Sequence, residues 1–402
     1  MIMAQLPRVK ITFAEGNLGK VGDSPDGLLA LMVASTAVGT TYELGKPYSI
    51  RSVGDLKGLK VSDKNNAALY KHVREFYAEA GEGTEVIIYG VEKTKTMTEL
   101  CTKGDTDEDA GELRKLITLC NGRLRAVAIA LDAQDEPEAA EGIVADVLSA
   151  IPKAQETAVY ATEALYAPLF VILEGRGFKR QGLKDLGELA CNRVGVFVGD
   201  TQPDGKGAAV GLLAGRIAAS AVQRNIGRVK DGKIAADAIY LSGQPIEQQT
   251  GAVADLYTKG YICPRQYVGR AGFYFCDDRL ATSESDDYAH VTARRTIDKA
   301  YRIAYDTLLS SLLDELELEA DGTLHPATIR SWEEEITAAV DRAMTAKKEL
   351  SADESTGSAC RFEILPTNVL ATSEVRGKLS VRPYGYARYI TVELGFTAVI
   401  SK

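Results

Sequence analysis

A chain of 402 residues is long enough for two or three domains, and 45% hydrophobic with 26% charged residues is typical of a globular protein with a core. The formal net charge of −9 disfavours a large basic face, so we expect no nucleic-acid partner. The six cysteines contain no C-x-x-C pair, which predicts free thiols in a reducing cytoplasm. The sequence shows neither a secretory leader nor a long apolar run, so we expect cytoplasmic assembly without membrane insertion.

The first predicted element is a short strand. In residues 8–13, strict alternation places Val9, Ile11 and Phe13 on one face. Residues 16–27 follow with four glycines and a proline, a composition that predicts a flexible arm. The first 27 residues therefore form an N-terminal strand and an arm that can move independently of the body.

The middle of the chain alternates between strand and helix patterns. The strand patterns are short runs rich in valine and isoleucine, at 85–91, 123–131, 169–173 and 193–198. The helical patterns lie at 63–80, 110–120, 137–163 and 182–191. Near-continuous apolar strands separated by helices predict a mostly parallel sheet with helices on both faces. We assign residues 28–266 to this α/β domain, with its core at 85–260.

The crossover at 193–226 is the place where a nucleotide site is worth testing against the sequence. A strand leads into a glycine-rich loop and a helix of small residues, which is the right context for a phosphate loop. The spacing is wrong, because five residues separate Gly199 from Gly205, and Gly207 stands where a hydroxyl should follow Lys206. We therefore predict a loop followed by a close-packed helix, and no cofactor.

Other candidates for chemistry are scattered. His72, His290 and His325 fall in three separate predicted elements, so they are interpreted as surface or capping residues, with His325 at a helix start. The acidic pairs 277–278 and 286–287 could act as acid and base, but next to glycine and serine they are more typical of solvated turns. We predict no catalytic residue, no metal site and no enzymatic activity.

Beyond residue 266 the pattern becomes α+β. Residues 267–282 read as strands with a turn at 269–272, and a long helix follows at 287–317. Its apolar stripe should face inward: Ile297, Tyr301, Ala304, Leu308, Leu312 and Leu316. A second helix begins at Pro326, with an inward stripe of Ile329, Trp332, Ile336, Val340 and Ala343, and strands follow at 361–365 and 377–382. We assign residues 267–386 to this domain and expect the two stripes to pack on each other and on a sheet.

The last sixteen residues, 387–402, form a C-terminal strand arm. Alternation places six apolar side chains on one face: Ile390, Val392, Leu394, Phe396, Ala398 and Ile400. Burying them all would contribute on the order of 10 kcal/mol as an upper estimate, so this face is expected to dock on something. The end strands could pair within their own subunit or add to the sheets of neighbouring subunits.

Three segments together resemble a known family. The run 293–300, Ala-Arg-Arg-Thr-Ile-Asp-Lys-Ala, enters the long helix just after a glycine-rich strand pair. The ending, with Lys-Leu-Ser-Val-Arg-Pro at 378–383 and Tyr-Ile-Thr-Val at 389–392, and the small-residue segment 211–219 complete the pattern. They resemble the tail sheath proteins of contractile phages and related injection systems, over the C-terminal half of the chain and the N-terminal strand.

The resemblance implies a structural subunit that polymerises helically around an inner tube. Its arms would add strands to neighbouring copies, and contraction of the lattice would drive the tube through a target envelope without nucleotide. The implied partners are identical subunits, the inner tail tube protein, and baseplate and tail-terminator proteins, in a virion tail or injection particle. The α/β domain would face outward and the α+β domain would lie near the tube. Two alternatives stay open: a cytoplasmic α/β nucleotide-binding enzyme, and another tail or baseplate structural protein.

Overall fold

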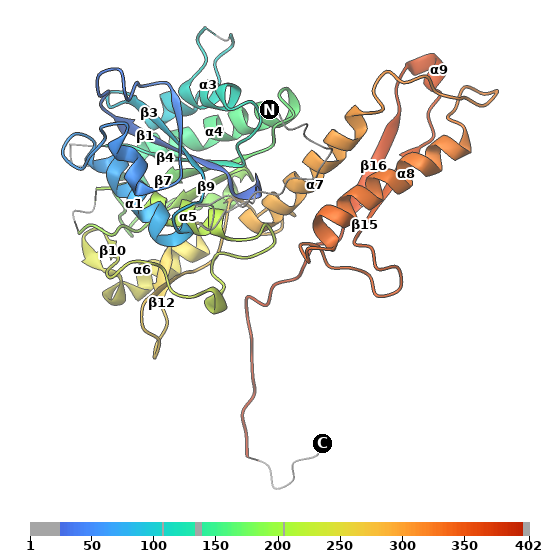
Figure 1. The fold of residues 1–402 in the computed structure, drawn as a ribbon. Helices are drawn as coiled ribbons and strands as arrows, with labels where there is room; N and C mark the ends of the chain where they lie inside the picture. Colours follow the sequence, from blue (N-terminus) through green and yellow to red (C-terminus); the bar gives the residue numbers. More distant parts are fainter. Residues whose placement is uncertain (1–24, 107, 133–138, 204–205, 397–402) are drawn as a thin grey trace, which may run out of the picture. The chain divides into compact units, whose positions relative to one another are not determined.

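The computed structural model describes residues 25–106, 108–132, 139–203 and 206–396 (Figure 1). They fall into two compact units, which divide between Arg302 and Ile303, within helix α7 (Val291–Leu309). Unit 1 precedes this division and unit 2 follows it. The domain boundaries read from the sequence, after residues 27, 266 and 386, stay a prediction.

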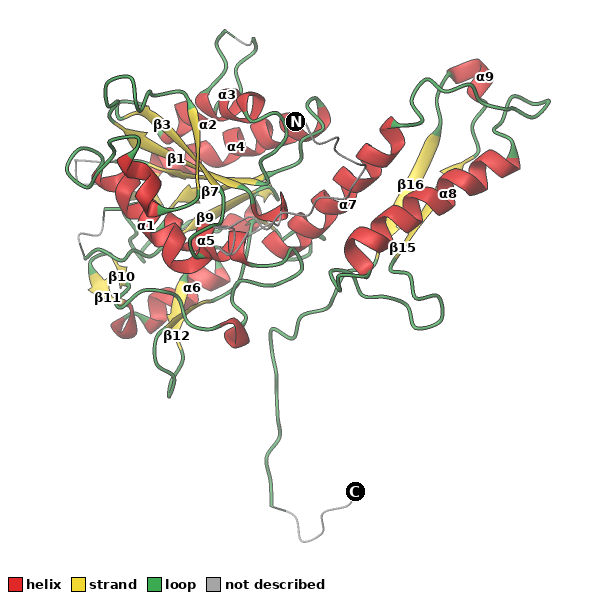
Figure 2. Ribbon diagram, in the orientation of Figure 1, coloured by secondary structure: helices red, strands yellow, loops and turns green. Residues whose placement is uncertain are grey.

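Unit 1 is built on a six-stranded sheet, shown in yellow between helices in Figure 2. Its order is β2-β3-β1-β4-β7-β9. The strands are β1 (Leu29–Ser35), β2 (Pro47–Ile50), β3 (Val86–Glu92), β4 (Ala126–Ala130), β7 (Phe170–Glu174) and β9 (Val194–Phe197). All neighbouring pairs are parallel except β2 with β3. The mostly parallel sheet expected from the valine- and isoleucine-rich runs is confirmed.

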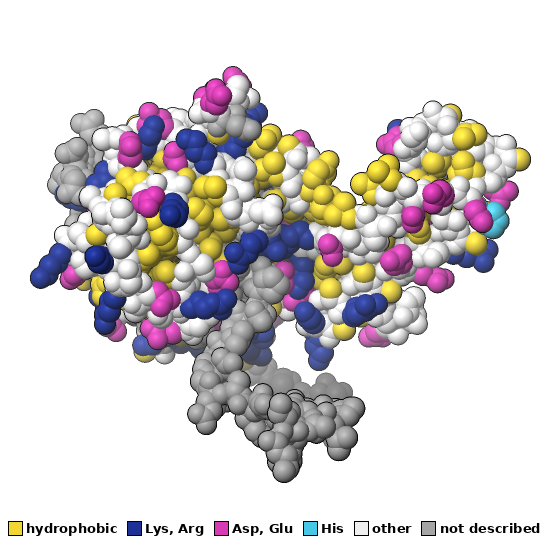
Figure 3. Space-filling model, turned by 45° about the horizontal axis from the view of Figure 1, so that its top comes forward, with side chains coloured by type: hydrophobic (Ala, Val, Ile, Leu, Met, Phe, Trp, Pro, Cys, Tyr) yellow, Lys and Arg dark blue, Asp and Glu magenta, His cyan; other side chains and the backbone are white. Residues whose placement is uncertain are grey.

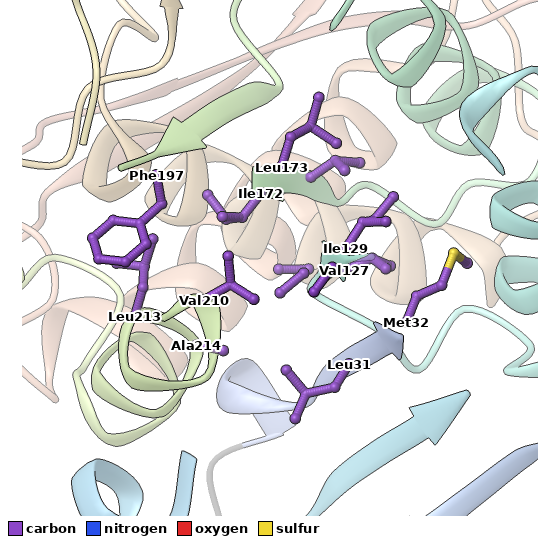
Figure 4. Close-up of a cluster of buried hydrophobic side chains, with 14 of the residues drawn as sticks. Leu31, Met32, Val127, Ile129, Ile172, Leu173, Phe197, Val210, Leu213 and Ala214 are labelled. Carbon is purple, nitrogen blue, oxygen red and sulfur yellow. The ribbon is translucent and has the colours of Figure 1, made fainter. Parts of the chain in front are cut away.

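Helices cover both faces of this sheet (Figures 1 and 2). Helix α1 (Ala67–Ala80) packs on α5 (Val210–Ala219), and α4 (Ala145–Glu163) packs with α2 (Met97–Cys101) and α3 (Glu112–Leu119). Every residue of β1, β4, β7 and β9 is buried, as expected for strands covered on both sides. Figure 4 shows Leu31 and Ile172 of the sheet on the side of Val210 and Leu213 of α5, whereas the strand register places Met32 and Ile129 on the opposite face.

Three sequence-based helices of unit 1 differ from the structure. The helix expected at 137–163 begins only at Ala145, after the short strands β5 (Ala139–Ala140) and β6 (Ile143–Val144). The segment 182–191 is not a helix: it contains a short 3-10 turn, Leu186–Glu188, and strand β8 (Ala190–Cys191). Three glycines at 177, 182 and 187 interrupt this region, and Gly177 and Gly182 adopt positive φ. Helix α1 begins at Ala67 rather than residue 63, although its predicted stripe at 69, 73, 76 and 77 is buried.

Smaller elements complete unit 1. They are β5 (Ala139–Ala140), β6 (Ile143–Val144), β10 (Tyr240–Leu241), β11 (Gln244–Pro245), α6 (Thr250–Thr258), β12 (Pro264–Gln266), β13 (Phe273–Phe275) and β14 (Ala281–Thr282). The expected turn at 269–272 and a strand after it, β13, are confirmed, whereas the strand before the turn, β12, lies at 264–266, just before the predicted range. Among the described residues, no helix is both long enough and apolar enough to cross a membrane.

Unit 2 contains a helix on a two-stranded sheet. Helix α8 (Pro326–Val340) packs against β15 (Cys360–Leu365), which pairs with β16 (Arg376–Val381); the short helix α9 (Val369–Thr372) lies between the strands in sequence. The strands are antiparallel, with Cys360 opposite Val381 and Leu365 opposite Arg376. Ile336 and Val340 of α8 are buried, as their helical spacing predicted.

Helix α7 is shorter than expected and buries a different face. It spans 19 residues, and Leu312, which was assigned to the inward stripe, is 68% exposed beyond its end. Ile297 and Tyr301 are only partly buried, whereas charged residues of the same helix are buried. The predicted apolar stripe is therefore wrong for the first half of α7, because this part packs through ion pairs.

Candidate functional site

The polar pocket at the carboxyl edge of the parallel sheet is the place where an α/β protein would hold a nucleotide. It measures about 140 Å³, and the residues after β4, β7 and β9 line it together with α1. The carboxylate of Glu174 fills the anion position in front of α5. It accepts the backbone N–H groups of Leu131 at 2.9 Å and Ala208 at 3.0 Å. Burial raises the pKa of Glu174. A phosphate would have to displace this buried carboxyl group, so the geometry does not favour nucleotide binding.

Other charged side chains of the pocket form ion pairs, some of them with residues outside it. Lys71 contacts Asp200 at 2.5 Å and Glu75 at 3.7 Å. Although burial alone would lower the pKa of Lys71, the charges of Glu75 and Asp200 raise it, so the ammonium stays protonated. Thr201 donates to Glu75, which also contacts the His72 ring at 3.2 Å. These contacts join α1 to the loop after β9, which is a structural role.

The three histidines belong to separate elements, and one of them, His72, differs from the sequence interpretation. His72 is buried in α1, at 2% exposed, rather than on the surface. His325 caps the start of α8, where its ring accepts the N–H of Ala327, as predicted. His290 lies directly before α7, with its Nδ1 3.0 Å from Asp278.

The acidic pair Asp277 and Asp278 is not a solvated turn, because the two residues are only 5% and 0% exposed. Asn225 donates to both carboxylates, at 2.6 and 2.9 Å, and the N–H of Thr292 donates to Asp278 at 2.8 Å. Burial, and then the neighbouring charge of Asp277, raise the pKa of Asp278. The cluster fastens the first turn of α7 to the segment after β13.

This cluster is also the group of described residues whose ligand atoms could surround a metal ion. One atom each of Asp277, Asp278 and His290 lie within 4.8 Å of one another. The hydrogen bonds from Asn225 and Thr292 already engage both carboxylates. These hydrogen bonds make the cluster a capping network at the start of α7.

A second polar cluster surrounds the next turns of α7. Asp298 accepts two hydrogen bonds from Arg193, at 3.0 and 3.2 Å, and it pairs with Arg294 at 2.9 Å. All three side chains are less than 10% exposed. This network joins α7 to the start of β9.

Asp26 extends the network to the segment that precedes β1. Lys299 contacts its carboxylate at 2.7 Å and Arg302 at 3.7 Å. Arg295 donates to the backbone oxygens of Ser220 at 2.8 Å and Asp26 at 3.4 Å. The segment that directly precedes β1 is therefore tied to α7 by charged side chains.

The predicted C-terminal arm carries exposed apolar side chains over its described part. Ile390 is 81% exposed, Val392 77%, Leu394 94% and Phe396 112%. Residues 389–396 belong to no strand in the described part of the chain. Val9, Ile11, Phe13, Ala398 and Ile400, the other residues assigned to the arms, lie outside the described residues.

The hairpin of unit 2 offers edges for further strands. In the described part of the chain, β15 and β16 pair only with each other. On the face toward α8, Phe362 stands opposite Leu379. On the other face, Glu363 stands opposite Lys378 and Arg361 opposite Ser380.

Comparisons with known proteins give the family. A family model described as DUF2586, N-terminal domain, matches residues 6–279, and its C-terminal counterpart matches residues 287–401. The chain belongs to the DUF2586 family. No curated protein matches it.

Solved structures similar to this DUF2586 protein come from contractile particles. A chain of the anti-feeding prophage (AFP) baseplate aligns with a TM-score of 0.63 at 14% identity, covering 98% of this chain and 99% of that one. A chain of the AFP helical sheath in the contracted state gives 0.62 at 14% identity, with the same coverage. A chain of the contracted sheath complex of the extracellular contractile injection system PVC gives 0.58 at 13% identity, covering 99% of both chains. The DUF2586 chain therefore has the contractile sheath fold, which confirms the resemblance read from the sequence.

The buried charges around α7 were missed by the sequence reasoning about sites. The available signal was the run Arg294-Arg295 followed by Asp298-Lys299, in which four charged residues share a predicted helix. That run supported only the family resemblance. Because its partners Asp26 and Arg193 are distant in sequence, no spacing rule connects them to it.

Proposed function

We propose that this DUF2586 protein is the structural subunit of a contractile sheath. Copies would polymerise helically around an inner tube, and contraction of the polymer would drive that tube through a target envelope. The sheath fold, shared over nearly the full chain with proteins of contracted sheaths, supports the proposal.

The observation that carries the proposal is the exposed apolar arm at 389–396. Four large hydrophobic side chains alternate along it, each more than three-quarters exposed. A soluble chain rarely leaves such a contiguous surface uncovered unless a partner buries it. The backbone of the arm also has N–H and C=O groups that a neighbouring strand edge can satisfy.

The β15–β16 hairpin is the proposed acceptor. A two-stranded sheet is marginally stable alone, whereas added strands would extend it and satisfy its edges. An arriving arm can place its apolar face beside Phe362 and Leu379, toward α8. The N-terminal residues Val9, Ile11 and Phe13 are proposed to add a second strand in the same way.

The proposed role is mechanical and non-enzymatic. An extended polymer held in a metastable state would contract when its subunit contacts rearrange, so the work comes from those contacts rather than from a nucleotide. The proposed partners are identical copies, an inner tube protein, and baseplate and tail-terminator proteins. Assembly would take place in the cytoplasm, and the product would be a virion tail or injection particle.

Leu394→Asp tests the strand donation. A carboxylate on the apolar face would have to be desolvated when the arm docks, so this variant should not polymerise while the isolated subunit stays folded. Thr391→Asp adds the same charge to the exposed opposite face of the arm and should still polymerise. Electron microscopy reads polymer formation, and circular dichroism reads the fold.

Polymers of normal length from Leu394→Asp would refute the donated arm, as would loss of folding in the isolated subunit. The enzyme alternative has its own measurement, calorimetry with ATP, GTP and NAD. Tight binding of any of them would overturn the non-enzymatic role.

A further inference from the structure

The turn between β12 and β13 forms an exposed basic tip, which we call the basic tip and define as residues 265–271. Val268 is 107% exposed, and Arg265 and Arg270 are exposed beside it. The guanidinium group of Arg265 lies 4.3 Å from the centroid of the Tyr267 ring, which in turn contacts Tyr274 at 5.4 Å. These contacts pack the side chain of Arg265 on the tip itself.

The charge of the basic tip is not balanced by its own segment. The sequence contains no aspartate or glutamate between Asp255 and Asp277. Lys233 lies under the turn at Gly272 and adds another positive charge nearby. On a chain with a net charge of −9, this is a local surface of opposite sign.

A loop of the opposite charge projects between α2 and α3. We call its described residues, 104–106 and 108–111, the acidic loop. Asp105 and Glu108 are exposed, and the sequence contains no lysine or arginine between Lys103 and Arg114. Asp109 accepts the N–H and hydroxyl of Thr106, at 2.7 and 2.9 Å, which shapes the loop. Figure 3 shows acidic side chains gathered on this protruding loop.

The two protrusions belong to opposite ends of unit 1. In Figure 1 the acidic loop extends above α3, and the β12–β13 turn extends below the sheet on the other side of the same unit. They cannot meet within one copy. A contact between two different patches of identical subunits is heterologous, and unless it closes into a ring it propagates as an open row.

We propose that the basic tip of one copy docks on the acidic loop of a second copy of this chain. Arg265 and Arg270 pair with the carboxylates of Asp105 and Glu108, and Val268 lies at the centre of the contact. Charge pairs at the rim of an interface fix the relative orientation of the two partners and raise their association rate. The inference rests on the proposed polymer and names a contact that is separate from the strand arms.

Charge reversal on each side, alone and together, tests the contact in the full-length protein. The variant Arg265→Glu/Arg270→Glu places acid against acid, and Asp105→Lys/Glu108→Lys places base against base. Each should weaken self-association in sedimentation velocity by about tenfold or more at low salt, and less at high salt, where charges are screened. The variant that carries all four substitutions has the net charge of the wild type, and it should associate again.

Lys57→Glu/Lys64→Glu is the matched control, because it reverses two exposed lysines elsewhere on unit 1. It should associate like the wild type. Circular dichroism verifies that each variant is folded. Polymerisation of the two single-sided variants at the wild-type level, or failure of the combined variant to recover, would overturn this contact and leave the sheath proposal standing. A wild-type chain that stays monomeric at every concentration and salt would overturn both.

Discussion

At the scale of single residues, Asp26 has the most consequential charge, because it lies where the N-terminal segment enters the body. Burial alone would raise the pKa of its carboxyl group. The hydrogen bond and charge of Lys299, with the charges of Arg302 and Arg125, outweigh burial and hold this pKa below its ordinary value. The ionised carboxylate therefore stabilises the folded state.

Asp26→Asn should lower the free energy of unfolding by roughly 3 kcal/mol at pH 7, because it leaves buried cations without their anion. A carboxyl group whose pKa is lower in the folded state stabilises the fold at any pH above its pKa in the unfolded chain, about 3.9. This stabilisation is lost as the pH falls through the pKa of the folded state. The difference between wild type and variant should thus stay constant from about pH 7 to 5 and shrink below about pH 4. Urea unfolding at a series of pH values measures it.

The exposed residue Asp63 provides the control, since Asp63→Asn should change stability by no more than about 0.5 kcal/mol. A difference between Asp26→Asn and wild type that persists unchanged at pH 3 would show that the effect comes from packing and not from the charge.

At the scale of elements, helices α1 and α5 approach each other closely because α5 carries glycine at two successive turns. A Cβ atom at Gly215 would overlap with the carbonyl oxygen of Phe76, and one at Gly211 with that of His72. The sequence predicted a close-packed small-residue helix here, and its burial confirms it. The two glycines lower the helix propensity of α5, but they allow its backbone to contact the backbone of α1.

Gly215→Ala should therefore destabilise unit 1, although alanine favours a helix by about 1 kcal/mol. We expect a net loss of roughly 1–3 kcal/mol, because the two backbones must separate. Gly385→Ala is the control, since a Cβ there meets no atom within 4 Å. Thermal unfolding compares the two, and a Gly215→Ala variant as stable as the wild type would mean that the helices separate without cost.

The elements also show what sequence patterns can resolve. Strands β4 and β7 were predictable because parallel strands covered on both faces need continuous apolar runs, which few other structures produce. The buried face of α7 was not predictable, because helical periodicity detects only the spacing of apolar residues. Arg294 and Asp298 are buried because they pair with each other and Asp298 pairs with Arg193. The same limit applies to Asp277 and Asp278, whose shielding by Asn225 depends on contacts some fifty positions away.

At the scale of the whole molecule, the arm is the part whose environment should differ between a single copy and an assembly. Its alternation predicted an apolar face, but no pattern within one sequence identifies the surface that covers it. The backbone of residues 389–396 belongs to no strand in the described structure. In isolated subunits, its amide hydrogens should therefore exchange rapidly with solvent.

In polymers the same amides should form hydrogen bonds to the β15–β16 hairpin of a neighbouring copy in place of water. Their exchange should therefore slow by at least about tenfold, which corresponds to about 1.4 kcal/mol of local opening free energy. Exchange followed by mass spectrometry measures this on peptides that cover the arm. Peptides from the loop at 351–359 serve as the internal reference, since the proposed strand addition leaves that loop unpaired. Protection of the arm in dilute single subunits would mean that it pairs within its own chain. Equal, rapid exchange in both states would mean that the polymer forms through other contacts, with the charged protrusions of unit 1 as the next candidates.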